Sequence, residues 1–203
     1  MDQEPSTRIA RSVIFDEFLV WDELTALMEY SRQHEQDFRQ SQVYNPGGGS
    51  ESYRRSRVLL DAGRFHRLMS ERIIFYLPRV LRALNHPFFD VSRVESQITA
   101  SNDGDYFHIH NDNTHANWPS REITFVYFFH REPRPFQGGE LMLYDTREGT
   151  PASTAAALRK RVTPEQNCII FFQSSSLHEI LRVRCLSRQF ADSRFTMNGW
   201  LHC

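Results

Sequence analysis

The sequence of 203 residues predicts a mainly β protein, in which helices pack outside an antiparallel sandwich or jelly roll. Residues 19–40 carry apolar side chains at helical spacing, and residues 65–85 form a second helical stretch, which Pro78 is expected to kink or split. After residue 88 the chain breaks into short runs rich in β-branched and aromatic residues, separated by glycine-containing turns. Helices followed by a long series of strands favour helices that cover one face of a β core.

The expected strands of this core are seven short runs. They are residues 91–100, 106–112, 123–130, 140–144, 168–172, 180–183 and 195–201, and a further strand is expected near residues 57–60. No linker separates the helical part from the β part. We therefore expect a single domain over residues 1–203, in which residues 1–88 form a helical support layer and residues 89–203 form the jelly-roll core.

The composition excludes several classes of protein. Sixteen phenylalanines and 40% hydrophobic residues are enough for a sizeable core, and a net charge of -1 disfavours nucleic acid as a partner. We expect no membrane span, because no apolar run approaches about 20 residues. The polar start and the three scattered cysteines favour an intracellular, cytoplasmic location. Lys160 is the only lysine beside 23 arginines, so any anion is expected to be bound by arginine.

One segment carries residues that are typical of a metal site. On a strand, residues two apart share a face, so His110 and Asp112 would project side by side and could occupy adjacent positions on one metal ion. His178, which follows an apolar strand and a serine-rich bend, is the candidate third ligand. Two histidines and one carboxylate form the facial triad of non-haem Fe(II) oxygenases. On its own, the His-x-Asp pattern is equally compatible with a surface ion pair or a turn.

Further motifs support the metal-site interpretation. They are Phe171-Phe172-x-Ser174 before His178-Glu179, Arg194 six residues before Trp200, Gly138-Gly139-Glu140-Leu141, and Arg121-x-x-Thr124. Together these motifs, in this order, resemble the prolyl 4-hydroxylase-like 2-oxoglutarate/Fe(II) oxygenases over about residues 91–201. The resemblance implies a double-stranded β-helix, with the N-terminal helices packed outside it.

The resemblance also implies a set of ligands. His110, Asp112 and His178 would bind Fe(II), and Arg194 would pair with the distal carboxylate of 2-oxoglutarate, which the planar fork of arginine suits. Arg188, in an insert between His178 and Arg194, is a rival for that carboxylate.

Other residues are assigned to the cosubstrate or to the substrate. Further candidates for binding 2-oxoglutarate are Thr99, Tyr127 and Asn198. Candidate substrate-facing residues are His108, Asn113, His115, Arg121 and Trp200. The run Arg54-Arg55-Ser56-Arg57 favours a solvated strand edge over an anion site, although it could face the substrate opening.

The activity that the resemblance implies is hydroxylation of an unactivated C–H bond, with O2 as a cosubstrate. The substrate would be a peptidyl residue, a free amino acid or another small metabolite. A carboxylate at Asp112 favours hydroxylation over halogenation, because related halogenases have a small residue there. Two alternatives remain: a cupin-like metal enzyme that does not use 2-oxoglutarate and has no use for Arg194, and a non-catalytic binding domain on the same fold.

Overall fold

The structure is a computed structural model that describes residues 11–41, 53–113, 120–144 and 159–203. Its helices are α1 (Trp21–Gln33) and α2 (Arg64–Leu84), with single turns of 3-10 helix at Glu35–Asp37 and Phe190–Asp192. All the other regular elements within these ranges are strands, which confirms the mainly β fold class.

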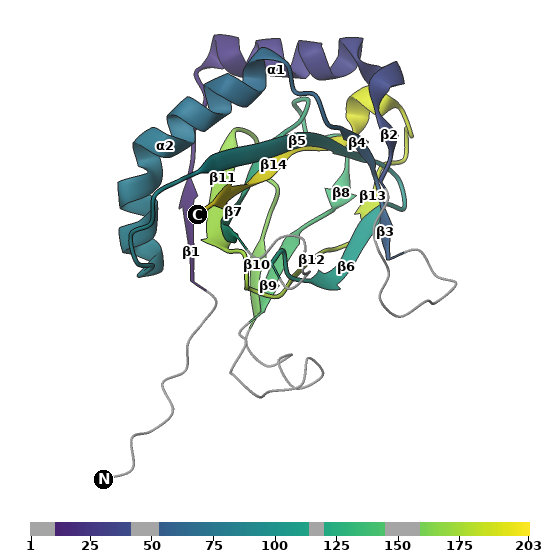
Figure 1. The fold of residues 1–203 in the computed structure, drawn as a ribbon. Coiled ribbons are helices and arrows are strands. Elements are labelled where there is room, and N and C mark those ends of the chain that lie inside the picture. Colours follow the sequence, from purple (N-terminus) through teal and green to yellow (C-terminus); the bar gives the residue numbers. More distant parts are fainter. Residues whose placement is uncertain (1–10, 42–52, 114–119, 145–158) are drawn as a thin grey trace.

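The described strands form two larger antiparallel sheets that face each other (Figure 1). The seven-stranded sheet has the order β1 (Ser12–Phe15), β11 (Cys168–Gln173), β7 (Arg121–Phe129), β14 (Arg194–His202), β5 (Arg93–Ser101), β4 (Arg57–Leu59) and β2 (Arg39–Gln40). The five-stranded sheet has the order β10 (Arg159–Val162), β9 (Leu141–Tyr144), β12 (His178–Ile180), β6 (Tyr106–His110) and β3 (Arg54–Arg55). A short pair joins β8 (Gln137–Gly138) to β13 (Val183–Arg184). Strands that alternate between two facing sheets are the arrangement of a jelly roll.

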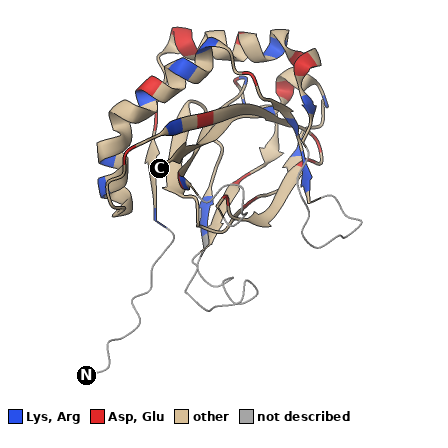
Figure 2. Cartoon of the chain, viewed as in Figure 1, with Lys and Arg blue, Asp and Glu red and all other residues tan. Residues whose placement is uncertain are grey.

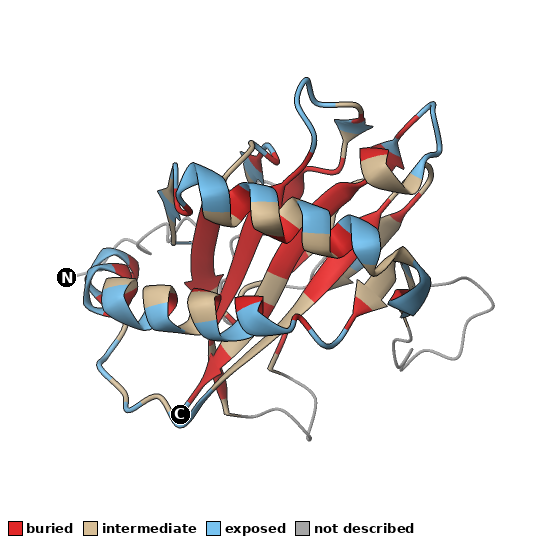
Figure 3. Ribbon diagram, turned by 90° about the horizontal axis from the view of Figure 1, so that it is seen from above, coloured by how far each residue is buried: buried red, intermediate tan, exposed pale blue. Residues whose placement is uncertain are grey.

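Both helices cover the outer face of the seven-stranded sheet, as the sequence predicts. Leu27 of α1 and Ile73 of α2 are fully buried in one cluster with Phe125 and Phe171 of the sheet below them. Seen from above, the exposed residues of both helices lie on the side turned away from the strands (Figure 3). Because this layer holds the seven-stranded sheet from outside, the opposite face of that sheet is free to line a pocket.

Strand β7 shows how the two layers divide the side chains. Alternate residues Phe125, Tyr127 and Phe129 belong to the cluster under the helices, whereas Val126 and Phe128 pack into a second cluster between the two sheets. Both faces of β7 are therefore apolar, as in a central strand that is covered on both sides.

Of the two expected effects of Pro78 on the second helix, the split is wrong. Helix α2 runs through Pro78 without a break. A proline removes the hydrogen bond to the carbonyl four residues earlier, here that of Ile74, and both residues lie on the exposed side of the helix. Water can satisfy that carbonyl, so the helix tolerates the loss.

The expected strand positions are confirmed to within a few residues, but short edge strands were missed. Five described strands lie in segments where no strand was expected: β1, β2, β3, β8 and β10. Four of them are the outermost strands of the two larger sheets, and β8 belongs to the short pair with β13. Acidic and basic residues are mixed over both helices (Figure 2), in line with the net charge of -1. None of the helices in the described ranges is long and apolar enough to cross a membrane.

Candidate metal centre and its pocket

Strand pairing brings the two predicted histidines together. His110 ends β6 and His178 begins β12, and the two residues are direct partners in the antiparallel pairing of these strands. Their ring centroids are 4.1 Å apart. Asp112 follows β6, with one carboxylate oxygen 3.8 Å from Nε2 of His110 and the other 3.5 Å from Nε2 of His178. The three ligand atoms all lie within 4.8 Å of one another, close enough to share one ion.

The hydrogen bonds of both imidazoles fix the ring nitrogen that is available to a metal. Nδ1 of His110 lies 2.7 Å from the carbonyl oxygen of His108, and Nδ1 of His178 lies 3.0 Å from that of Ser176. A carbonyl only accepts, so each Nδ1 carries the proton and each Nε2 keeps a lone pair. Burial, together with the charge of His178, lowers the pKa of His110 to about 3. The neutral imidazole that binds a metal is therefore the stable form.

Asp112 is held by its neighbours on the seven-stranded sheet and the bend before β12. The hydroxyl of Thr124 donates to Oδ2 of Asp112 at 2.7 Å, and the backbone N–H of Asp112 donates to the carbonyl oxygen of Ser174 at 2.8 Å. Burial raises the pKa of Asp112, but the two histidines and the hydrogen bond from Thr124 outweigh it, so the pKa lies below its usual value. The side chain is thus an oriented carboxylate. This donor set of two imidazoles and one carboxylate fits Fe(II).

A β-bulge changes which neighbour of His110 faces the same side. In the pairing of β6 with β12, His110 is opposite His178 but Phe107 is opposite Ile180, so β6 contains one extra residue between its two partners. Phe107 therefore stacks on His110, with ring centroids 3.6 Å apart. His108 is exposed and lies beside Tyr106 and Tyr53. Because the bulge reverses the alternation, His108, a candidate substrate-facing residue, does not share the face of His110 and does not line the cavity.

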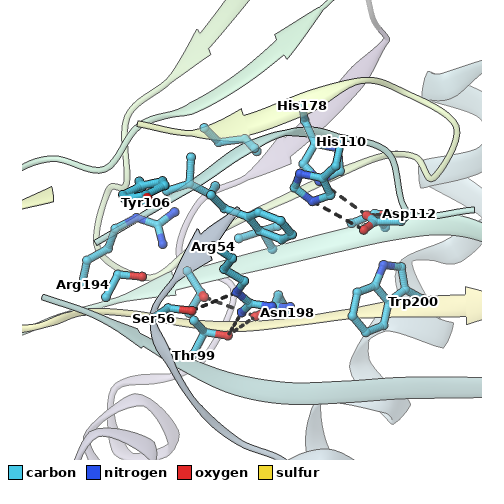
Figure 4. Close-up of a pocket in the computed structure, with 17 residues that line it drawn as sticks. Arg54, Ser56, Thr99, Tyr106, His110, Asp112, His178, Arg194, Asn198 and Trp200 are labelled. Atoms are coloured by element: carbon cyan, nitrogen blue, oxygen red, sulfur yellow. Dashed lines mark hydrogen bonds and ion pairs between the residues drawn. The ribbon is translucent and has the colours of Figure 1, made fainter. Parts of the chain in front are cut away.

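The triad lies in a cavity of about 70 Å³ between the two sheets (Figure 4). Arg194, the first residue of β14, lies at the other end of this cavity and is only 2% exposed. Its Nε donates to the carbonyl oxygen of Gly139 at 2.7 Å, whereas its Nη2 is buried without a hydrogen-bond partner among the described residues. Burial lowers the pKa of Arg194 to about 9, against the opposing charge of Glu140. A buried cation with an unused donor is a site prepared for an anion.

Gly139, of the Gly138-Gly139 pair before β9, makes room for Arg194. Gly139 has a φ of +71°, and a Cβ on it would lie 2.6 Å from Cδ of Arg194. A side chain at this position would displace the arginine, so glycine is required both by the backbone conformation and by the close approach. Gly139 therefore helps to position the buried cation.

Arg188, the rival to Arg194, lies outside the cavity. Its side chain is 78% exposed, and Nε forms an ion pair with Asp103 at 3.1 Å. The insert that contains it therefore does not fold into the pocket. The geometry leaves Arg194 as the arginine of this pair that can meet a buried carboxylate.

Of the three other residues predicted to bind 2-oxoglutarate, two face the cavity and one faces the helical layer. Thr99 and Asn198 both line the cavity, and the hydroxyl of Thr99 donates to Oδ1 of Asn198 at 2.8 Å. Tyr127 lies on the other face of β7, fully buried in the cluster under the helices, where its hydroxyl donates to Asn167. The expectation that Tyr127 helps to bind 2-oxoglutarate is incompatible with this position.

Of the remaining candidate substrate-facing residues, the structure places only some beside the cavity. Trp200 lines the cavity beside Asp112, but Arg121 packs behind it, with its guanidinium carbon 3.5 Å from the centroid of the indole and its Nη2 bonded to Glu95. Arg121 is thus a support for the wall of the pocket, and the expectation that it faces substrate is wrong. Asn113 does not line the cavity, and its side-chain amide donates to the backbone of Arg121 at 3.4 Å. His115 lies outside the described residues.

One residue of the pocket was misjudged from the sequence. Arg54, the first residue of β3, extends into the cavity between the triad and Asn198 (Figure 4). The neighbouring Arg55 is 57% exposed and pairs with Asp105, as expected of a solvated strand edge. The period of two along a strand places Arg54 and Arg55 on opposite faces, but the sequence alone does not show which of the two faces the pocket.

The fold and the site together define a class of protein. An antiparallel jelly roll with two histidines and one aspartate at the mouth of a pocket is the architecture of a metal-dependent enzyme that keeps coordination positions open for other ligands. Residues 96–202, just over half of the chain, match the family described as the 2OG-Fe(II) oxygenase superfamily. The chain belongs to this superfamily.

A relative with a similar sequence supports the same family assignment. A protein of Synechocystis sp. that is described as an uncharacterized PKHD-type hydroxylase is 46% identical over 151 residues, which cover 73% of this chain and 50% of that protein. The present chain therefore spans about half the length of this relative.

Solved structures show the same fold. A prolyl-4-hydroxylase from Pseudomonas putida has a TM-score of 0.64 at 17% identity, over 95% of this chain and 92% of that one. A prolyl hydroxylase from Trichoplax adhaerens, solved in complex with a peptide fragment of hypoxia inducible factor, has a TM-score of 0.67 at 15% identity, over 95% of this chain and 84% of that one. These likenesses confirm the predicted jelly roll.

Proposed function

We propose that the protein is an Fe(II)- and 2-oxoglutarate-dependent dioxygenase that hydroxylates an unactivated C–H bond. Membership of the superfamily supports the general chemistry. The observation that carries the proposal for this chain is the buried guanidinium of Arg194, whose Nη2 has no partner among the described residues and faces the same cavity as the triad. A buried charge of this kind is costly unless it meets an opposite charge, and a dicarboxylate cosubstrate supplies one.

In this proposal His110, Asp112 and His178 bind Fe(II) through the two Nε2 atoms and a carboxylate oxygen. When bound, iron and 2-oxoglutarate supply the oxidising power for the reaction with O2, which amino-acid side chains lack. The chain contributes orientation. Carbonyl oxygens hold the protons of the histidines on Nδ1, and Thr124 holds the carboxylate of Asp112, so the ligand atoms point to one place before any ion binds.

Arg194 binds the distal carboxylate of 2-oxoglutarate in this proposal. Its guanidinium is fixed by the bond to Gly139 and by the ring of Phe128, whose centroid lies 5.1 Å from the guanidinium carbon. A fixed fork presents its remaining donors to a carboxylate with little loss of side-chain entropy. Thr99 and Asn198, on the floor of the same cavity, provide neutral polar contacts along its length.

Several of the remaining walls of the cavity are apolar. Phe107, Leu141, Ile180 and Trp200 line it with apolar surface. A dry pocket strengthens the electrostatic interactions inside it and protects reactive species from side reactions. We infer that the two sheets and the helical layer act as one catalytic unit, because the pocket draws residues from both sheets and the helices hold one of them.

The substrate class proposed from the family resemblance is a peptidyl residue, a free amino acid or another small metabolite. The Trichoplax adhaerens enzyme that shares the fold is described with a peptide. For the present chain, the position of Arg194 disfavours a cupin-like enzyme without 2-oxoglutarate, because such an enzyme has no use for that cation.

The test of the proposed function is direct. The protein, loaded anaerobically with Fe(II), is mixed with 2-oxoglutarate and O2, and succinate formation is measured with and without candidate substrates. Succinate that depends on both iron and 2-oxoglutarate, and that is lost in Asp112→Ala, is the expected result. Failure of 2-oxoglutarate to bind to the metal-loaded protein would refute the proposal and favour the cupin-like alternative.

A further inference from the structure

The β-bulge in β6 lies directly before the candidate ligand His110. The pairing of β6 with β12 places two residues, His108 and Ile109, opposite the single residue Glu179. A bulge disrupts the ladder of backbone hydrogen bonds between two strands and leaves the extra residue unpaired with the partner strand. On its other side β6 pairs with β3 (Figure 1), and the chain next to β3 bonds to both residues of the bulge.

Tyr53, the residue directly before β3, makes both of these hydrogen bonds. The backbone N–H of His108 donates to the carbonyl oxygen of Tyr53 at 3.1 Å. The phenol hydroxyl of Tyr53 donates to the carbonyl oxygen of Ile109. Burial raises the pKa of Tyr53, so the hydroxyl keeps the proton that it donates. One residue therefore holds the bulge at two points, once through its backbone and once through its side chain.

The carbonyl group of His108 belongs to the peptide unit between these two points. It accepts the hydrogen bond from Nδ1 of His110 at 2.7 Å, and this bond leaves Nε2 of His110 available to a metal. Because a peptide unit is planar and rotates as a whole, a shift of the bulge would turn this carbonyl away from the imidazole. Tyr53 thus acts on the ring of His110 through one peptide unit.

The ring of Tyr53 contacts the second support of His110. It meets the ring of Phe107 edge to face, with the centroids 5.9 Å apart, and Phe107 stacks on His110 at 3.6 Å. Edge-to-face contact is a favoured geometry for two aromatic rings. Tyr53→Phe keeps this ring contact and loses only the hydroxyl, so the two contributions can be separated.

The other histidine of the triad is oriented from a different segment. Nδ1 of His178 lies 3.0 Å from the carbonyl oxygen of Ser176, in the bend before β12. Neither Tyr53 nor the bulge takes part in that hydrogen bond. His178 is therefore an internal control for any effect of Tyr53 on His110.

We propose that Tyr53 is a positioning residue of the metal centre: its hydroxyl fixes the bulge in β6, and the bulge holds His110 with Nε2 available to the metal. This inference rests on the proposed function and adds a residue that is not among those lining the cavity. Tyr53 acts through His110, and the groups that orient metal ligands in this way tune metal affinity.

The test compares two variants that each lose one phenol hydroxyl bonded to a backbone carbonyl. Tyr53→Phe loses the bond to Ile109, and the matched control Tyr30→Phe loses a bond to the carbonyl oxygen of Asp61, at 3.2 Å, in the helical layer. Affinity for Zn(II) is measured by competition with a chelator. It should fall by about 10- to 100-fold in Tyr53→Phe and stay within about twofold in Tyr30→Phe.

A second readout follows the rings in the metal-free protein. Long-range proton–nitrogen correlation spectra of protein with isotope-labelled histidine report which nitrogen carries the proton in each neutral imidazole. At neutral pH both His110 and His178 should carry it on Nδ1, and His110→Gln and His178→Gln assign the signals. In Tyr53→Phe the signals of His110 should move toward a mixture of the two tautomers, while those of His178 stay unchanged.

The outcomes separate this inference from the proposed function. Unchanged Zn(II) affinity in Tyr53→Phe, with or without a lower Tm, would overturn the inference and leave the dioxygenase assignment standing. Lower affinity with an unchanged tautomer of His110, or with an equal change at His178, would also overturn it, because the hydroxyl would then not act through His110. If the original protein binds no metal at the triad, the proposed function falls and the inference falls with it.

Discussion

Replacing Arg194 by methionine should make the ligand-free protein more stable. The guanidinium is fully buried, its Nη2 has no partner among the described residues, and burial lowers its pKa to about 9. Methionine has a similar length and no charge. Replacing buried charged groups by apolar residues of similar volume is often neutral or stabilising by about 1–4 kcal/mol, so the free energy of unfolding of Arg194→Met should rise within that range.

The same replacement should abolish stabilisation by 2-oxoglutarate. At a concentration of about 100 times Kd, a ligand stabilises a protein by about 2.7 kcal/mol, which for a chain of 203 residues raises Tm by about 5–11 °C. Loss of a buried ion pair costs about 3–5 kcal/mol, which is a loss of more than 100-fold in affinity. The shift in Tm at the same 2-oxoglutarate concentration should therefore fall to about 1 °C or less in Arg194→Met.

Thermal unfolding with Zn(II) present throughout, with and without 2-oxoglutarate, measures both effects in one experiment. Arg188→Met is the matched control, because Arg188 is exposed and pairs with Asp103, and it should keep the full ligand-dependent shift. A less stable Arg194→Met protein that 2-oxoglutarate still stabilises would refute the reasoning. It would show that Arg194 supports the fold and that the carboxylate binds elsewhere.

Four further substitutions test separate parts of the structure. Asp112→Ala should abolish tight Fe(II) binding in a metal-competition titration and leave the circular dichroism spectrum unchanged; retained affinity would exclude Asp112 as a ligand. Thr124→Val removes the donor to Oδ2 of Asp112 and should weaken metal affinity by about 10- to 100-fold, and an unchanged affinity would show that packing alone holds the carboxylate. Gly139→Ala places a Cβ 2.6 Å from Arg194 and should lower both Tm and the affinity for 2-oxoglutarate, so a loss of only one of the two would contradict the close approach. Pro78→Ala restores a helical hydrogen bond at an exposed position and should raise the free energy of unfolding by about 1–3 kcal/mol in urea denaturation, whereas a destabilised variant would mean that the helix depends on the proline.

The grouping of the three candidate metal ligands could be predicted from the sequence because residue type and order are themselves the signal. Two histidines and one aspartate, each next to an apolar run, suffice to propose a triad, and the arginine six residues before Trp200 completes the set. The partner of each ligand could not be predicted. That Thr124 donates to Asp112, and that carbonyl oxygens orient both histidines, depends on how the bend around Ser174 and Ser176 folds against the sheet.

The direction of side chains on a central strand could not be predicted either. Residues 123–129 of β7 are apolar or aromatic at almost every position, because one face lies under the helices and the other between the sheets. Alternation identifies the inward face only when the two faces differ in polarity. Tyr127, which looks suited to bind a ligand, therefore lies in the core, while Val126 lines the pocket.

The β-bulge in β6 determines which arginine enters the pocket. In a regular strand, residues 107 and 110 lie on opposite faces, and the cross-strand partner of Phe107, Arg54, would then point away from the metal centre. The extra residue in β6 places Phe107 on the face of His110, and Arg54 follows it into the cavity. A single inserted residue that no local pattern in the sequence reveals thus sets the charge of the pocket. The electrostatic character of this site follows from strand register, and composition alone does not determine it.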